Sequence, residues 1–196
     1  MLRFRLILIA IGAIFLGACT STGIRTGSAL DRTGERWQLS GKIGLRAPQL
    51  AESAYVNWRQ CGAQFNIRIS GPLGQTVARI EGRDEQLILQ FEGREAMATR
   101  EPEALMQQQL GWSLPIRALR YWVRAEAAPG SAAEFSGPSQ QPNTLQQDQW
   151  RVDYLAYHQS NTATLPAKLR LSGDQNLQAT LLINEWSLGD AVDCPH

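Results

Sequence analysis

From residue 37 onward, most of the chain alternates apolar and polar side chains with a period of two, the pattern of β-strands that bury one face. The alternation is clearest at 39–46, 56–59 and 65–70. Further segments, separated by turn residues such as Gly, Pro and Asp, lie at 76–82, 86–92, 95–99, 150–157, 169–171 and 177–186. Because the connections are short, we expect about eight or more strands in an antiparallel sheet.

Two short segments have helical spacing instead. The first is EPEALMQQQLG (101–111), where Pro102 stands near the start and Gly111 at the end. The second covers 115–124 and begins with Pro115, a residue favoured in the first turn of a helix. Residues 127–149 are rich in Pro, Gly, Ser, Ala and Gln, which predicts a long surface loop with room for one weak strand. No internal repeat is visible, so we expect 37–196 to form one mainly β domain.

The N-terminus has the pattern of an export signal. Arg3 and Arg5 precede an apolar run at 6–15 that is too short to span a bilayer as a mature helix. The following Leu-Gly-Ala-Cys, which ends at Cys19, resembles the lipobox of bacterial lipoproteins. The resemblance implies that 1–18 is a signal peptide that is removed and that Cys19 is acylated. The alternatives are an ordinary signal peptide with a chance cysteine, or an uncleaved anchor.

Residues 20–36 are polar and rich in Gly, Ser and Thr, so we expect 19–36 to be the acylated cysteine and a flexible tether. Lipid anchoring gains about 0.8 kcal/mol per buried methylene, so several acyl chains hold a protein stably where one does not. In the lipoprotein pattern an Asp after the cysteine favours retention in the inner membrane. This chain has Thr20, which implies an outer-membrane lipoprotein that faces the periplasm.

Composition argues against several functions. Without 1–18 the chain has 17 basic and 18 acidic residues, a balance that argues against nucleic-acid binding. His158 and His196 are the only histidines, too few for a catalytic triad or a histidine metal site. Acidic pairs at 84–85 and at 101 and 103 fit turn and helix-start positions. We therefore expect no enzyme activity, no cofactor and no metal.

Cys61 and Cys194 remain as an even pair in a compartment where disulfides persist. Cys61 lies in a predicted hairpin turn and Cys194 follows the last strand. A disulfide between them would hold the C-terminal tail to the sheet. The alternative is two free thiols. The distance between the two cysteines would decide, and the sequence does not supply it.

A family resemblance covers most of the chain after the signal. The segments that carry it are WQLSGKIGLR, VNWRQ, RISGPLGQTVARIEG, LGWSLPIRALRYWVRAEAAPG, DQWRVDYLAY, LPAKLRLSG and the closing NEW. In order and spacing they resemble the outer-membrane lipoprotein LolB family. The resemblance implies an unclosed antiparallel β-barrel, a LolA/LolB-like half-barrel, with a helical lid over an apolar cavity. The paired cysteines depart from the family pattern.

The resemblance also implies a function. A protein of this family accepts acylated lipoproteins from the periplasmic carrier LolA and inserts them into the inner leaflet of the outer membrane. The implied partners are a LolA-like carrier, the acylated lipoprotein cargo and, through the anchor, the outer membrane. We expect a monomer. The competing hypotheses are a half-barrel lipoprotein that binds or carries free lipids or glycolipids, and a structural envelope lipoprotein with a filled core.

The stretch SGPLGQT (70–76) places a leucine at the tip of a predicted tight turn. Pro72 suits position i+1 and Leu73 takes i+2, while Gly74 can adopt the left-handed conformation that follows a type I turn. From the residues alone, Leu73 could instead fold back over the sheet. The family resemblance implies that Pro72, Leu73 and Gly74 form a protruding loop whose leucine delivers cargo into the membrane.

Candidate acyl-chain residues are those on the apolar faces of the strands and of the helical lid, and we expect about half of them to touch a chain. They are Val56, Trp58, Ile67, Ile69, Leu87, Leu89, Leu105, Leu119, Trp122, Trp150, Val152, Tyr154, Leu181 and Ile183.

Overall fold

The computed structural model describes residues 36–83, 86–159, 163–173 and 176–194. These residues form one antiparallel sheet with the strand order β6-β5-β4-β3-β2-β1-β11-β10-β9-β8-β7. The strands are β1 (Arg36–Ala47), β2 (Leu50–Cys61), β3 (Gln64–Ser70), β4 (Thr76–Arg83), β5 (Gln86–Phe91), β6 (Met97–Thr99), β7 (Ala133–Ser136), β8 (Thr144–Gln147), β9 (Trp150–Gln159), β10 (Thr164–Ser172) and β11 (Gln178–Leu188). Except for β6 and β7, strands adjacent in the sequence pair with each other, and β1 also pairs with β11.

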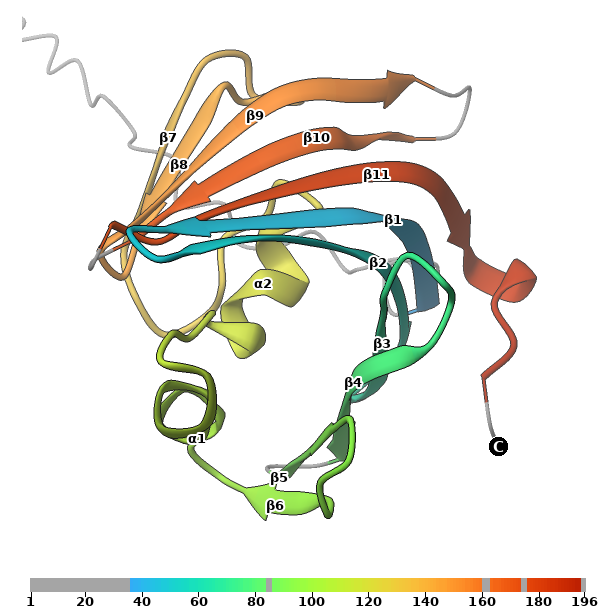
Figure 1. Ribbon diagram of the computed structural model, residues 1–196. Coiled ribbons are helices and arrows are strands. Elements are labelled where there is room, and N and C mark those ends of the chain that lie inside the picture. Colours follow the sequence, from blue (N-terminus) through green and yellow to red (C-terminus); the bar gives the residue numbers. More distant parts are fainter. Residues whose placement is uncertain (1–35, 84–85, 160–162, 174–175, 195–196) are drawn as a thin grey trace, which may run out of the picture.

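The sheet is bent around two helices, α1 (Pro102–Leu110) and α2 (Ile116–Trp122), which lie on its concave side (Figure 1). Its edges are β6 and β7, which are not neighbours in the sheet of the described residues. The sheet is therefore an unclosed barrel with a helical lid. This confirms the predicted fold class.

Proline and glycine set the limits of α1. Pro102 occupies the first turn, where its missing amide hydrogen costs no helical hydrogen bond. Gly111 ends the helix with φ 77°, and its amide donates to the Gln107 carbonyl. The second helix ends at Trp122, two residues before the predicted end. Its last turn tightens there, because the Arg124 amide bonds to the Tyr121 carbonyl and Ala125 adopts φ 60°.

The predicted loop 127–149 contains two strands, β7 and β8, where the composition left room for one weak strand. The buried amide of Gln147 fixes this region, since its Oε1 accepts from Trp122 Nε1 at 2.8 Å and from the Ala128 amide at 2.9 Å. Its Nε2 donates to the Ala128 carbonyl at 2.7 Å. A buried polar group that is fully hydrogen-bonded holds β8 against the end of α2.

Aromatic side chains fill the end of the barrel where β1 begins. Trp37 lies with its ring centroid 5.2 Å from that of Trp58 and 5.6 Å from that of Trp186. Trp58 also lies 6.0 Å from Phe65. Trp37 and Trp58 are buried, so this end of the concave side is closed by packed rings.

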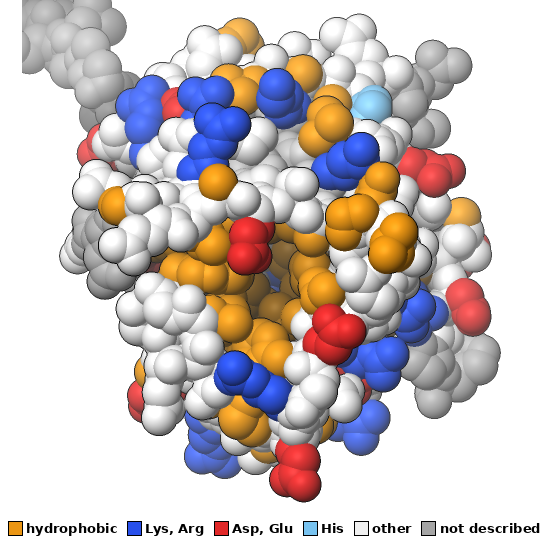
Figure 2. All heavy atoms as spheres, viewed as in Figure 1, with side chains coloured by type: hydrophobic (Ala, Val, Ile, Leu, Met, Phe, Trp, Pro, Cys, Tyr) orange, Lys and Arg blue, Asp and Glu red, His pale blue; other side chains and the backbone are white. Residues whose placement is uncertain are grey.

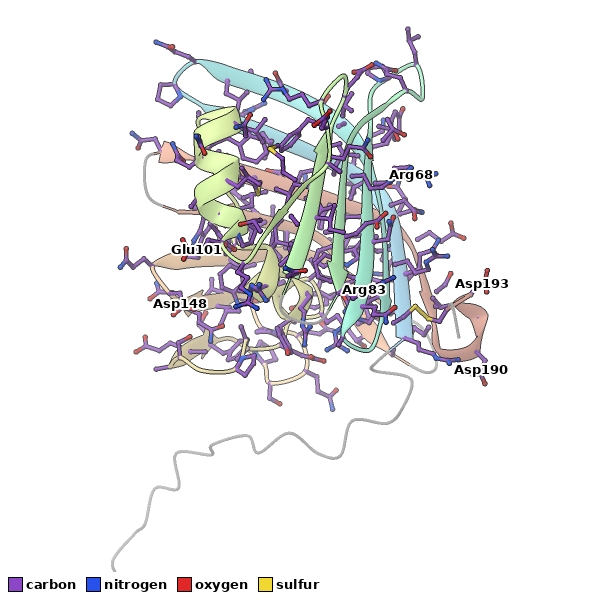
Figure 3. All side chains as sticks on the ribbon, turned by 90° about the horizontal axis from the view of Figure 1, so that it is seen from below. Arg68, Arg83, Glu101, Asp148, Asp190 and Asp193 are labelled. Carbon is purple, nitrogen blue, oxygen red and sulfur yellow. A yellow bond between two sulfur atoms is a disulfide. The ribbon has the colours of Figure 1, made fainter. Side chains whose placement is uncertain are left out.

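The C-terminal segment crosses the same end of the sheet. A 3-10 helix, η3 (Gly189–Ala191), follows β11, and Cys194 then forms a disulfide with Cys61 at a Cα–Cα distance of 5.8 Å. Arg59 Nη1 donates to the Asp193 carbonyl at 3.1 Å. Figure 3 shows the disulfide beside Asp190 and Asp193, with Arg68 farther along the sheet and pointing outward.

Removal of this disulfide is expected to lower the free energy of unfolding by about 2–4 kcal/mol, because it joins residues 133 positions apart and restricts the unfolded chain. The variant is Cys61→Ser combined with Cys194→Ser, measured by chemical denaturation. Reductant should destabilise the wild type to the level of the variant and leave the variant unchanged. A variant as stable as the oxidised wild type would show that the bond does not contribute.

Candidate functional site

A cavity of about 430 Å³ lies between the concave face of the sheet and the two helices. The strands provide most of its wall, and α1, α2 and their connection provide the rest. Figure 2 shows the hollow open on one face of the molecule, with hydrophobic side chains around it. The lining residues are Ile43, Leu45, Glu52, Ser53, Ala54, Val56, Trp58, Ile67, Ile69, Gly71, Pro72, Gln75, Val77, Ala78, Ile80, Phe91, Met106, Leu110, Trp112, Leu114, Ile116, Leu119, Val123, Leu171 and Leu181.

The polar lining residues mark the mouth. Glu52, Ser53 and Gln75 lie on the wall and are exposed, whereas Trp58 and Ile67 are buried near the closed end. Glu52 is the only charged side chain among the described residues that line the cavity. An interior of this kind suits a flexible hydrocarbon chain, because it provides apolar contact and few polar groups that need a partner.

The β3–β4 turn stands at this mouth. The Gly74 amide donates to the Gly71 carbonyl at 2.9 Å, and the Gly71 amide donates to the Gln75 carbonyl at 2.9 Å. The first of these bonds closes a β-turn in which Pro72 and Leu73 occupy the two central positions. Gly74 follows them in the left-handed conformation, with φ 83°. The Leu73 side chain is 94% exposed and does not fold back over the sheet. Pro72 beside it lies on the cavity wall.

Six of the fourteen predicted acyl-chain residues line the cavity, and they come from β2, β3, β11 and α2. They are Val56, Trp58, Ile67, Ile69, Leu119 and Leu181. The other eight lie outside the wall, either within the hydrophobic core or packed against it. They are Leu87, Leu89, Leu105, Trp122, Trp150, Val152, Tyr154 and Ile183.

The end of α2 explains why the β9 residues do not reach the cavity. The Trp122 ring packs 6.4 Å from Trp150, and the Tyr154 hydroxyl donates to the Trp122 carbonyl at 2.9 Å. Trp122 is fully buried and fills the space in front of β9. The concave face of the sheet is thus longer than the cavity, because α2 packs directly on one part of it.

Several lining residues were absent from the prediction although the sequence carries a signal for them. Ile43 and Leu45 follow the same alternation as Leu39, so their inward direction could be read from the period of two. Met106 and Leu110 are four residues apart on the first helix and share one face. The wall also includes Trp112, which lies in the connection between the helices, where no periodicity indicates direction.

Titratable groups with shifted pKa values lie away from the cavity. Burial raises the pKa of Tyr154 far above its ordinary value and raises the pKa of Tyr157 to about 12. Both phenols donate a hydrogen bond to a backbone carbonyl and stay protonated well above neutral pH. Arg124 and Glu126 form an ion pair, and burial lowers the pKa of the arginine and raises that of the glutamate. None of these four lines the cavity.

The model of the family described as "Outer membrane lipoprotein LolB" matches residues 35–186, which is more than half of the chain. The chain belongs to the LolB family. It is 44% identical over 151 residues to the outer-membrane lipoprotein LolB of Stutzerimonas stutzeri, covering 76% of this chain and 73% of the relative. It is 35% identical over 201 residues to LolB of Pseudomonas paraeruginosa, covering 94% and 97%.

Solved structures show the same fold at low sequence identity. A LolA superfamily protein from Nitrosomonas europaea matches with a TM-score of 0.52 and 8% identity, over 80% of this chain and 87% of that chain. A DUF1329 family protein from Desulfovibrio piger matches with a TM-score of 0.55 and 5% identity, over 81% and 88%. The unclosed sheet with helices on its concave side is therefore shared beyond the LolB family.

Membership of the LolB family makes this chain a non-catalytic lipoprotein receptor of the outer membrane, with a role in lipoprotein sorting. Within the described residues, no helix has the length and apolar character needed to cross a membrane. The same residues contain no group of three His, Cys, Asp or Glu side chains arranged to hold a metal ion. The predicted signal peptide, Cys19 and most of the tether lie outside the described residues.

Proposed function

We propose that the cavity binds an acyl chain of the lipoprotein cargo, which the protein accepts from a LolA-like periplasmic carrier and inserts into the inner leaflet of the outer membrane. The observation that carries this proposal is the open apolar cavity, whose only charged lining residue among those described is Glu52 near the mouth. Acylated Cys19 and the tether 19–36 hold the single domain 37–196 at that membrane as a monomer.

The size of the cavity supports binding of one long acyl chain. Its volume is about 430 Å³. A water molecule has a share of about 30 Å³ in the liquid, and a methylene group is of similar size, so the space suits roughly fourteen methylene groups. That is close to one long acyl chain. An open cavity of this size favours transport over a structural protein with a filled core.

The energetics favour direct transfer between cavities. Burial of a sixteen-carbon chain is worth roughly 12 kcal/mol, so release into water would be very slow. Passage from the carrier's apolar cavity into that of the receptor avoids this intermediate. The transfer needs no nucleotide when the receptor binds the chain more tightly than the carrier and the bilayer binds it more tightly than both.

The turn at the mouth supplies the last step of the proposed function. Leu73 projects an apolar side chain from a turn that two backbone hydrogen bonds hold in shape, so the leucine can enter the lipid interface with little change of the backbone. Pro72 connects this tip to the cavity wall. Contact of Leu73 with the bilayer would therefore bring the mouth of the cavity to the membrane surface.

The test is a transfer assay with the full chain in vesicles and a carrier–lipoprotein complex in solution, without ATP. We expect the cargo to leave the carrier and appear in the vesicles. A carrier of free lipids would leave the lipoprotein on its cognate carrier and would instead exchange phospholipids or glycolipids.

A further inference from the structure

We infer that the outer face of the sheet beside the Leu73 tip binds the headgroups of a bilayer that contains anionic phospholipids. Three side chains form this surface, named here the headgroup patch: Lys42 on β1, Tyr55 on β2 and Arg68 on β3. The inference rests on the proposed role of the Leu73 tip. It adds that the surface beside the tip prefers lipids with negatively charged headgroups.

Strand register places the patch next to the tip. Tyr55 pairs with Ser70, the last residue before the turn, and Lys42 pairs with Tyr55. Lys42 Nζ lies 4.9 Å from the centre of the Tyr55 ring, and the tyrosine is 46% exposed. Arg68 is two residues before Ser70 and so lies on the same face of β3. Figure 3 shows Arg68 on the outer side of the sheet.

The two cations of the patch have no acidic partner. Neither Lys42 nor Arg68 forms an ion pair with any residue that the structure describes. Arg68 pairs across the sheet with Asn57 and Arg79, and Lys42 pairs with Leu182 and Tyr55. The local charge is therefore positive and exposed, which is complementary to phosphate headgroups.

The order of side chains from the tip matches the layers of a bilayer surface. Leu73 is three residues beyond Ser70, which at strand spacing places it at most about 10 Å past the row of Tyr55 and Lys42. Interfacial segments bury their apolar side about 5–10 Å into the headgroup boundary. When Leu73 reaches the acyl boundary, Tyr55 lies at headgroup level, where amphipathic rings are favoured, and Lys42 lies beside it. Arg68 is two residues farther from the tip, and its long side chain can reach toward the phosphates.

The test compares insertion of cargo by the full chain into phosphatidylcholine vesicles and into vesicles that also contain phosphatidylglycerol. Each basic residue near an anionic surface raises binding about fivefold, so Lys42→Gln with Arg68→Gln is expected to slow insertion about 25-fold on the anionic vesicles. On pure phosphatidylcholine the variant should equal the wild type. High salt should remove the difference, because the charges are exposed.

Arg83→Gln with Arg100→Gln is the matched control, since it removes the same charge. Both arginines line a polar groove together with Arg59 and Cys61, at the opposite end of the β3–β4 hairpin from the tip. This control should insert cargo like the wild type on both kinds of vesicle.

Two results would overturn the inference. One is a Lys42→Gln/Arg68→Gln variant that inserts at the wild-type rate on anionic vesicles. The other is a variant that loses acceptance of cargo from the carrier on both kinds of vesicle, which would make the patch a protein-binding surface. Leu73→Glu distinguishes this inference from the proposed function. If the Leu73 tip has no role in delivery, Leu73→Glu will insert cargo at the wild-type rate on both kinds of vesicle.

Discussion

Replacement of Leu73 by glutamate is expected to abolish insertion of cargo into vesicles while acceptance from the carrier continues. The side chain is 94% exposed, so the change removes little packing and should not lower stability. At the hydrocarbon boundary the change replaces a favourable apolar group by a charge, a difference of up to about 3 kcal/mol or more than a hundredfold in contact with the membrane. The measurement is the amount of cargo on the protein and in the vesicles over time.

Two variants serve as controls for this result. Leu73→Ile keeps an apolar tip and should insert cargo normally. Leu155→Glu adds the same charge at another exposed leucine, on β9, and should also insert normally. If Leu73→Glu inserts cargo at the wild-type rate, the tip has no part in delivery.

Filling the cavity is expected to abolish acceptance of cargo. Ala78 on β4 lies on the cavity wall, so Ala78→Trp places a large ring in the open space rather than in the packed core. The added ring excludes part of the acyl chain from the cavity. Each excluded methylene group costs about 0.8 kcal/mol of binding free energy, so exclusion of four lowers the affinity for the chain about 200-fold. The measurement is the fraction of cargo that moves from the carrier to the variant, with the melting temperature as a check on folding.

The matched control is Ala98→Trp, which puts the same side chain at an exposed position on β6. This variant should accept cargo like the wild type. Normal acceptance by Ala78→Trp would mean that the chain is bound elsewhere on the molecule.

The period of two indicates the strands and their inward faces, but it does not indicate which part of the concave face remains open. Val56 and Val152 have the same alternation, yet one lines the cavity and the other is packed in the core. The difference arises from α2, whose Trp122 covers β9. That contact joins residues far apart in the sequence, so no local pattern contains it.

Local chemistry was more informative at the turns. Pro72 and Gly74 predict the β3–β4 turn, and the structure has its hydrogen bond and its left-handed glycine. The strands β7 and β8 were harder to predict, because they depend on the buried contacts of Gln147 with distant residues. The disulfide likewise depends on a distance between positions 61 and 194 that only the fold supplies.

The most direct test of the proposed function is whether an acyl chain of the cargo occupies the cavity. The full chain with labelled Ile and Leu methyl groups would be loaded with a lipopeptide carrying ¹³C-labelled acyl chains, and contacts would be read from nuclear Overhauser effects. We expect contacts from the chain to the methyl groups of Ile69, Ile80 and Leu119, which line the cavity, and none to Leu145, which is buried on β8 outside the cavity wall. Contacts confined to exposed methyl groups such as those of Leu155 and Leu182 would contradict the proposed function.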